Sequence, residues 1–164
     1  MKIGIVSDSH GKADRLRQAV ELLVGRGAQA IVHCGDIGSA ECVDALAGAG
    51  VPAYAVAGNM DRHLDRLQAR AQEKGVHFSL DTILVPIGGG SYLAATHGSN
   101  ALLVRALAAE GRFPYVCHGH THAIRDERIQ RVRIINPGAL HHAQRRTAAL
   151  LDTDADTLEH LELS

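Results

Sequence analysis

Side chains that can bind a metal ion recur along this chain where short apolar runs end. The motif CHGHTH (residues 117–122) holds three histidines at alternate positions, and SDSH (residues 7–10) holds Asp8 and His10 two residues apart. Residues i and i+2 of an extended segment point to the same side, so both members of such a pair can reach one centre. These motifs indicate a metal site, but alone they identify neither the ion nor the reaction.

Three further apolar runs also end in candidate ligands. HCGD supplies Asp36, AGNMD supplies Asn59, and THGS supplies His97. Because sites in α/β proteins form at the carboxyl ends of parallel strands, we expect all these side chains to meet at one edge. The predicted ligands are Asp8, His10, Asp36, Asn59, His97, His120 and His122.

The number and type of these ligands bear on the reaction. Oxygen and nitrogen donors in this number are too many for one tetrahedral ion but suit two ions that share a carboxylate. Two divalent ions about 3.5–4 Å apart are a common device for hydrolysing phosphate esters. A donor set without thiolate favours manganese, iron, zinc or nickel. We therefore expect two divalent transition-metal ions per chain, with Mn²⁺ first and Ni²⁺, Fe or Zn²⁺ as alternatives.

Apolar patterns predict the elements that would carry these ligands. Runs at 2–6, 30–34 and 51–57 are typical of strands and alternate with helical patterns, among them 40–48 and 62–74, which predicts parallel pairing. GGG at 88–90 indicates a hairpin, followed by a helix over 100–110. After the strand at 115–119, the segments 124–135 and 147–163 read as antiparallel pairs. A parallel half and an antiparallel half predict two sheets packed face to face with helices outside, in one domain over 1–164.

Composition limits the classes of partner. The 164 residues carry a formal net charge of −1 and only 3% aromatics, which argues against a stable nucleic-acid partner. No apolar run approaches a membrane span, and MKIGIVSDSH lacks the apolar region of a signal peptide. The three cysteines, without a CxxC pair, are expected to be reduced thiols of a cytoplasmic protein.

The ordered motifs DxH, GD, GN, HG and GHTH resemble those of the calcineurin-like metallophosphoesterase superfamily, in particular its small bacterial and archaeal phosphodiesterase branch. The resemblance covers roughly residues 3 to 140. It implies a four-layer αββα sandwich, with two mixed β-sheets face to face, and a centre of two metal ions. By position, it implies two ligand sets and a bridge: Asp8, His10 and His122; Asn59, His97 and His120; and Asp36 between them. A hydroxide bridging the ions would then attack phosphorus.

The sequence departs from the family pattern around these ligands. Met60 stands where much of the superfamily has a histidine thought to protonate the leaving group. Asp61 is a candidate replacement acid, although capping the helix that follows is the alternative role. Asn59 and His97 are also candidate substrate contacts. His33 and His118 are expected to pack or to orient ligands, while His141 and His142 could lie at the rim or in a solvated loop, and Lys12, Arg15 and Arg62 could lend charge near phosphate or lie on helix surfaces.

We therefore predict a metal-dependent phosphodiesterase acting on a small phosphodiester, without membrane association and with a homo-oligomer possible. A phosphomonoesterase is the alternative within enzymes. A non-catalytic, metal-binding scaffold of the same fold is the alternative outside them, and the intact ligand set argues against it.

Overall fold

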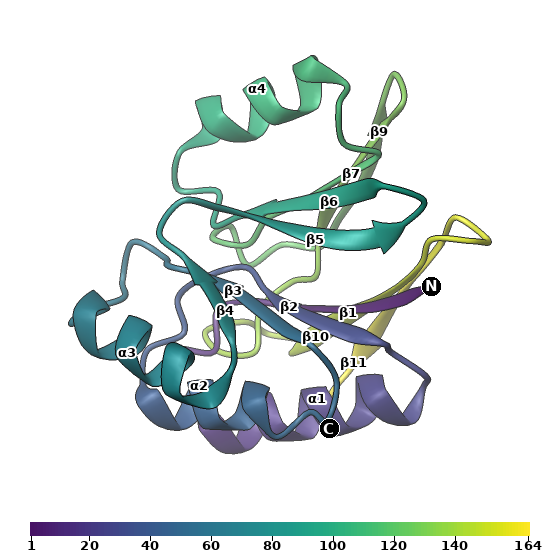
Figure 1. Ribbon diagram of the computed structural model, residues 1–164. Coiled ribbons are helices and arrows are strands. Elements are labelled where there is room, and N and C mark those ends of the chain that lie inside the picture. The colour runs from purple at the N-terminus through teal and green to yellow at the C-terminus, as the bar shows by residue number, and fades with distance from the viewer.

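Two mixed β-sheets face each other in the computed structural model, which describes residues 1–164 (Figure 1). The first sheet has the order β11-β10-β1-β2-β3-β4, in which β1 to β4 are parallel and β10 is antiparallel to both of its neighbours, β1 and β11. Its strands are β1 (Lys2–Val6), β2 (Ala30–His33), β3 (Ala53–Val56), β4 (His77–Ser79), β10 (Thr147–Asp152) and β11 (Thr157–Glu162).

The second sheet has the order β5-β6-β7-β9-β8. Its three central strands are parallel, and each edge strand joins them through an antiparallel hairpin. The GGG segment forms the predicted turn between the first two strands. The strands are β5 (Thr82–Gly88), β6 (Ser91–Thr96), β7 (Tyr115–Cys117), β8 (Arg125–Ile129) and β9 (Val132–Asn136).

Helices cover the outer face of each sheet, so the predicted αββα layering is confirmed (Figure 1). Three helices lie on the first sheet: α1 (Ala13–Gly25), α2 (Ala40–Ala47) and α3 (Leu64–Lys74). The fourth, α4 (Ala101–Glu110), lies on the second sheet. Ser39 and Asn100 cap α2 and α4 by accepting hydrogen bonds from backbone amides. None of the four helices combines the length and the apolar character needed to cross a bilayer.

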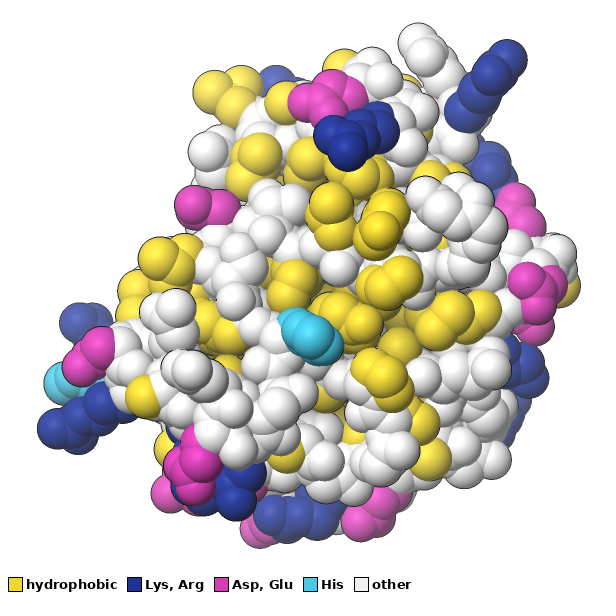
Figure 2. Space-filling model, viewed as in Figure 1, with side chains coloured by type: hydrophobic (Ala, Val, Ile, Leu, Met, Phe, Trp, Pro, Cys, Tyr) yellow, Lys and Arg dark blue, Asp and Glu magenta, His cyan; other side chains and the backbone are white.

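The alternation of side chains along each strand divides the interior into layers. In β1, Ile3 and Ile5 belong to the core between the sheets, whereas Val6 packs into the core under α1, α2 and α3. A smaller core lies under α4, around Val116 and Ile134. Across the middle of the face in Figure 2, hydrophobic side chains gather, and charged side chains lie mainly toward the margins.

The structure differs from the predicted strands in two respects. The antiparallel strands of the second half do not all belong to the second sheet, because β10 pairs with β1, with Ile3 opposite Leu151. The short apolar run identifies β10 as a strand but carries no information about its partner. The segment His77–Ser79 was not expected to be a strand; three residues are too few for a periodic signal, and β4 is defined by its pairing with β3.

Candidate metal centre

Loops that follow five strands bring the candidate ligands to one edge of the molecule. Asp8 and His10 follow β1, Asp36 follows β2, and Asn59 follows β3, all in the first sheet. In the second sheet, His97 follows β6 directly, and His120 and His122 follow β7. Five of these residues have φ between 46° and 68°, namely Asp8, His10, Asp36, His120 and His122. Each such non-glycine conformation costs about 1–3 kcal/mol and is typical of functional sites.

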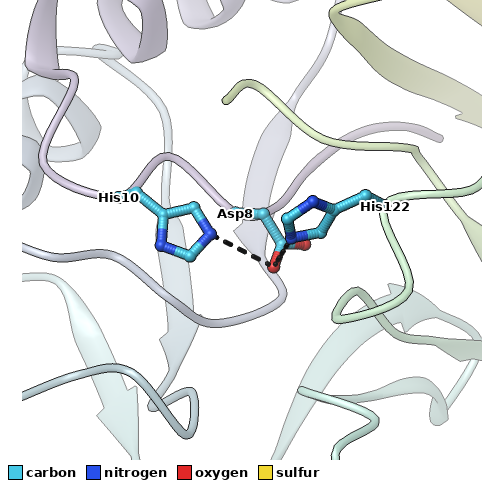
Figure 3. A group of neighbouring side chains, drawn as sticks. All are labelled: Asp8, His10 and His122. Carbon is cyan, nitrogen blue, oxygen red and sulfur yellow. Dashed lines mark ion pairs between the residues drawn. The ribbon is translucent and has the colours of Figure 1, made fainter. Parts of the chain in front are cut away.

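Asp8, His10 and His122 form the first cluster of potential ligand atoms. Figure 3 shows both imidazoles turned toward one oxygen of the Asp8 carboxylate, with Nε2 of His122 at 3.2 Å and Nε2 of His10 at 3.9 Å. The other oxygen of Asp8 accepts hydrogen bonds from the Ser7 hydroxyl (2.5 Å) and the His120 amide (3.1 Å). Asp8 Oδ1 and His10 Nε2 have no hydrogen-bond partner although both are buried. Unpaired buried acceptors are rare, and a bound cation would satisfy both atoms.

Asp8, Asp36 and His97 form the second cluster. The Oδ1 atom of Asp36 accepts a hydrogen bond from the Met60 amide (2.8 Å), and its Oδ2 atom faces the site. That Oδ2 lies 3.4 Å from Nε2 of His97 and 3.8 Å from Nε2 of His10. Asp8 belongs to both clusters, but Asp36 Oδ2 lies between the histidines predicted to serve different ions, which favours Asp36 as the shared ligand.

Backbone carbonyls set the orientation of two ligand histidines. Nδ1 of His97 donates to the carbonyl of Cys34 (2.8 Å), and Nδ1 of His122 donates to the carbonyl of His142 (3.2 Å). Each ring therefore turns Nε2 toward the carboxylates, the arrangement usual for metal-bound histidine. Sequence reasoning did not identify these carbonyls, because a backbone carbonyl leaves no signal in residue types.

The two remaining candidates lie beside His97. Asn59 Oδ1 is 2.9 Å from His97 Nε2, so two acceptor atoms face each other unless the ring is protonated or a cation lies between them. The ring of His120 is 5.1 Å from the ring of His97, nearly edge-on, but His120 is exposed and contributes no atom to either cluster. The structure thus gathers five of the predicted ligands in the two clusters and places the other two at their margin.

The charges around Asp36 are set by burial and by hydrogen bonds. Burial opposes ionisation of Asp36, but hydrogen bonds from His97 and from the Met60 amide hold its pKa below the ordinary value. Burial likewise opposes charge on His97, yet the Asp36 carboxylate and the Cys34 carbonyl raise its pKa. Burial lowers the pKa of His10 despite Asp36 and Asp8 nearby. The cluster combines ionised carboxylate with imidazole nitrogens, a donor set that suits divalent transition metals.

Glycine allows the ligand loops to approach closely. A Cβ atom on Gly119 would overlap the Ser7 hydroxyl and the Asp8 carboxylate, and one on Gly58 would overlap Asp36. Only glycine leaves room for these close approaches at the two positions.

Asp61 lies in the same loops but takes another role than those predicted. Its carboxylate accepts hydrogen bonds from the amides of Ile37 (3.1 Å), Gly38 (2.7 Å) and Gly58 (2.8 Å). These bonds tie the loop after β2 to the loop after β3. The predicted helix-capping role is wrong, because α3 begins at Leu64 after His63, with no side-chain cap. An acid role gains no support from this position, since both oxygens are engaged by backbone donors.

Other histidines surround the centre. The rings of His141 and His142 lie 6.1 Å and 5.3 Å from the ring of His10, so both are at the rim. Nη1 of Arg15 is 2.6 Å from Nδ1 of His141 and supplies positive charge there. His33 is fully buried, and its Nδ1 accepts the amide of Gly35 (3.2 Å). Burial lowers the pKa of His33 to about 3.

The sequence also matches a known protein family and one of its characterised members. Residues 1–156 match the model of the calcineurin-like phosphoesterase superfamily domain. The chain is 27% identical over 138 residues to a phosphodiesterase of Methanocaldococcus jannaschii, an alignment that covers 84% of this chain and 83% of the relative.

The chain also shares its fold with solved structures. A structure described as a novel archaeal phosphodiesterase superposes with a TM-score of 0.90 at 27% identity, covering 99% of this chain and all of the other. Zinc-bound Vps29 of Entamoeba histolytica shares the fold, with a TM-score of 0.63 at 17% identity and 99% of each chain covered. The sheets, the ligand edge and the family match together show that this chain belongs to the calcineurin-like phosphoesterase superfamily.

Proposed function

We propose that the protein is a phosphodiesterase that works with two divalent metal ions. One observation carries this proposal: Asp36 Oδ2 lies within 3.8 Å of His10 Nε2 and 3.4 Å of His97 Nε2, so one carboxylate oxygen faces histidines of both predicted ligand sets. Asp8, His10 and His122 would hold one ion, and Asn59, His97 and His120 would hold the other. When bound, the ions would lower the pKa of an attacking water and neutralise charge on the phosphate.

The chain's own residues would position the substrate and limit its leaving group. Asn59 and His97 lie where they can also contact a phosphate oxygen, and the Arg15–His141 pair adds donors at the rim. Met60 is 54% exposed beside Asp36, and its side chain cannot donate a proton. We therefore expect diesters with good leaving groups to be the better substrates. The homologue from Methanocaldococcus jannaschii, itself named a phosphodiesterase, supports diester rather than monoester hydrolysis.

The test measures metal content and turnover together. Purified protein loaded with manganese should hold close to two ions per chain and should hydrolyse bis(4-nitrophenyl) phosphate faster than 4-nitrophenyl phosphate. The reverse preference would indicate a monoesterase, and bound metal without turnover of either ester would indicate a scaffold.

The substitution Asp36→Asn tests the shared ligand. Because changes in residues that only orient metal ligands cost about 10–100-fold, loss of a ligand shared by two ions should lower kcat/KM by more than about 100-fold. Asp65→Asn, at an exposed position on α3, is the matched control and should retain full activity. A similar loss in both variants would contradict the assignment of Asp36.

A further inference from the structure

A groove opens beside the candidate metal centre, on the outer face of the second sheet. It has a volume of about 460 Å³ and is lined by α4 on one side and by β8 and β9 on the other. Figure 1 shows α4 lying across this face. Gly98 and Thr121 line the groove, and each is the next residue in the chain after a candidate ligand, His97 and His120 respectively. The groove is therefore continuous with the loops that carry the metal ligands.

Both walls of the groove start at the metal edge and run away from it. The helix α4 begins at Ala101, soon after His97, and β8 begins at Arg125, soon after His122. The lining on α4 extends from Ala101 to Ala109, which corresponds to a wall about 12 Å long at 1.5 Å per residue. None of the seven candidate ligands lines the groove, which meets the metal edge at Gly98 and Thr121.

The lining indicates what the groove would accept. Val104, Ala108 and Ile134 are buried apolar side chains that form part of it. Arg105 lines it from α4 and takes part in no ion pair, whereas Arg125 is paired with Glu127 (Nη2 to Oε2, 2.6 Å) and has Nη1 3.4 Å from Nε2 of the buried His118. Apolar walls with a few polar groups are typical of small-molecule sites, and the unpaired guanidinium group of Arg105 disfavours a cationic ligand.

We propose that this groove binds the organic group esterified to the scissile phosphate, and that this group has an apolar ring or chain and is neutral or anionic. The inference rests on the phosphodiesterase function proposed above. It makes α4 and β8 the elements that determine substrate choice, separate from the residues that hold metal.

Binding of two phosphonates tests the groove without turnover, because a C–P bond is not hydrolysed. Calorimetry on the manganese-loaded protein would compare methylphosphonate with 1-naphthylmethylphosphonate, and we expect the naphthyl compound to bind at least about tenfold more tightly. Ala101→Phe, which fills the inner end of the groove, should remove that difference and leave the Kd of methylphosphonate unchanged. Ala106→Phe places the same side chain at an exposed position of α4 outside the groove and should change neither Kd.

Each outcome bears on the inference. Equal Kd values for the two phosphonates in the wild-type protein, or equal effects of Ala101→Phe and Ala106→Phe, would overturn it. If Ala101→Phe does not fold, the wild-type comparison alone decides. Hydrolysis of bis(4-nitrophenyl) phosphate by the same preparation separates the two ideas: turnover with equal Kd values would reject only the groove, whereas no turnover of any ester would reject the proposed function.

Discussion

The buried His33 should make folding sensitive to acid by an amount that can be worked out. The side chain is fully buried at the end of β2, its Nδ1 accepts the amide of Gly35, and its Nε2 lies 2.8 Å from the Ser9 hydroxyl, which donates to the carbonyl of Ile37. The neutral ring with a proton on Nε2 satisfies this arrangement. A second proton would put charge on a desolvated ring and break the bond from Gly35.

The sign and size follow from the shift in pKa. Burial lowers the pKa of His33 from 6.5 to about 3 in the folded protein, so the unfolded chain binds the proton more readily. The contribution of the neutral His33 to the free energy of unfolding is therefore fully present above about pH 6.5. It is lost as the pH decreases toward 3, by about 1.4 kcal/mol per pH unit. At pH 5 the loss in the free energy of unfolding from this residue is about 2 kcal/mol.

The measurement is urea unfolding at several pH values between 7.5 and 5, with a chelator present so that metal release does not contribute. His33→Gln should be less stable than wild type at pH 7.5 but should lose less stability on acidification, so the two curves converge by about 2 kcal/mol at pH 5. His77→Gln, at the exposed first position of β4, removes a histidine outside the core and should run parallel to wild type. Parallel curves for His33→Gln and wild type would refute the assignment of a buried neutral ring.

Three other substitutions or additions test the site. Asp61→Asn should lower the free energy of unfolding by about 1–3 kcal/mol, because the NH₂ group of the new side chain would face one of the three backbone N–H donors that now bind Asp61. It should reduce activity far less than Asp36→Asn does. Equal losses of activity in the two variants would contradict the role of Asp61 in tying the two loops together. In urea unfolding without the chelator, manganese at 100 times the Kd of each site should stabilise wild type by about 2.7 kcal/mol per bound ion, or about 5.4 kcal/mol for two ions, with little effect on Asp36→Asn. Met60→His should raise kcat/KM at least about tenfold for diesters with poor leaving groups, relative to Met60→Gln, and an equal gain with 4-nitrophenyl esters would argue against acid catalysis.

The parts of the fold that could be predicted are those with a local signal. The strands around the ligand loops alternate with helices in the chain, and the ligand types stand where the strands end, so β1, β2, β3, β6 and β7 and their loops were identified from the sequence. Asp36 could be recognised in this way because it follows an apolar run and precedes a glycine-containing turn. The same reasoning explains why the layered arrangement of helices and sheets was predicted correctly.

The parts that could not be predicted depend on partners distant in the chain. The β10–β11 hairpin has the same apolar run and turn whichever sheet it joins, and in the structure Leu151 of β10 packs with Ile3 of β1 in the core between the sheets. Asp61 stands before a helix, as a capping residue would, but its actual partners are the amides of Ile37 and Gly38 in the loop after β2 and of Gly58 in its own loop. The local sequence pattern at Asp61 indicates a helix cap, but its hydrogen bonds to the loop after β2 determine what the side chain does in the structure.

The candidate metal ligands come from both sheets, and this origin has a thermodynamic consequence. Asp8, His10, Asp36 and Asn59 are carried by the first sheet, whereas His97, His120 and His122 are carried by the second. The 3.4 Å separation of Asp36 Oδ2 from His97 Nε2 therefore depends on how the sheets pack through the core between them. Ions held at this edge would bind only the packed state, so metal affinity and inter-sheet packing must stabilise each other. The glycine at 119, which lets the second sheet's loop reach Asp8, belongs to that same linkage.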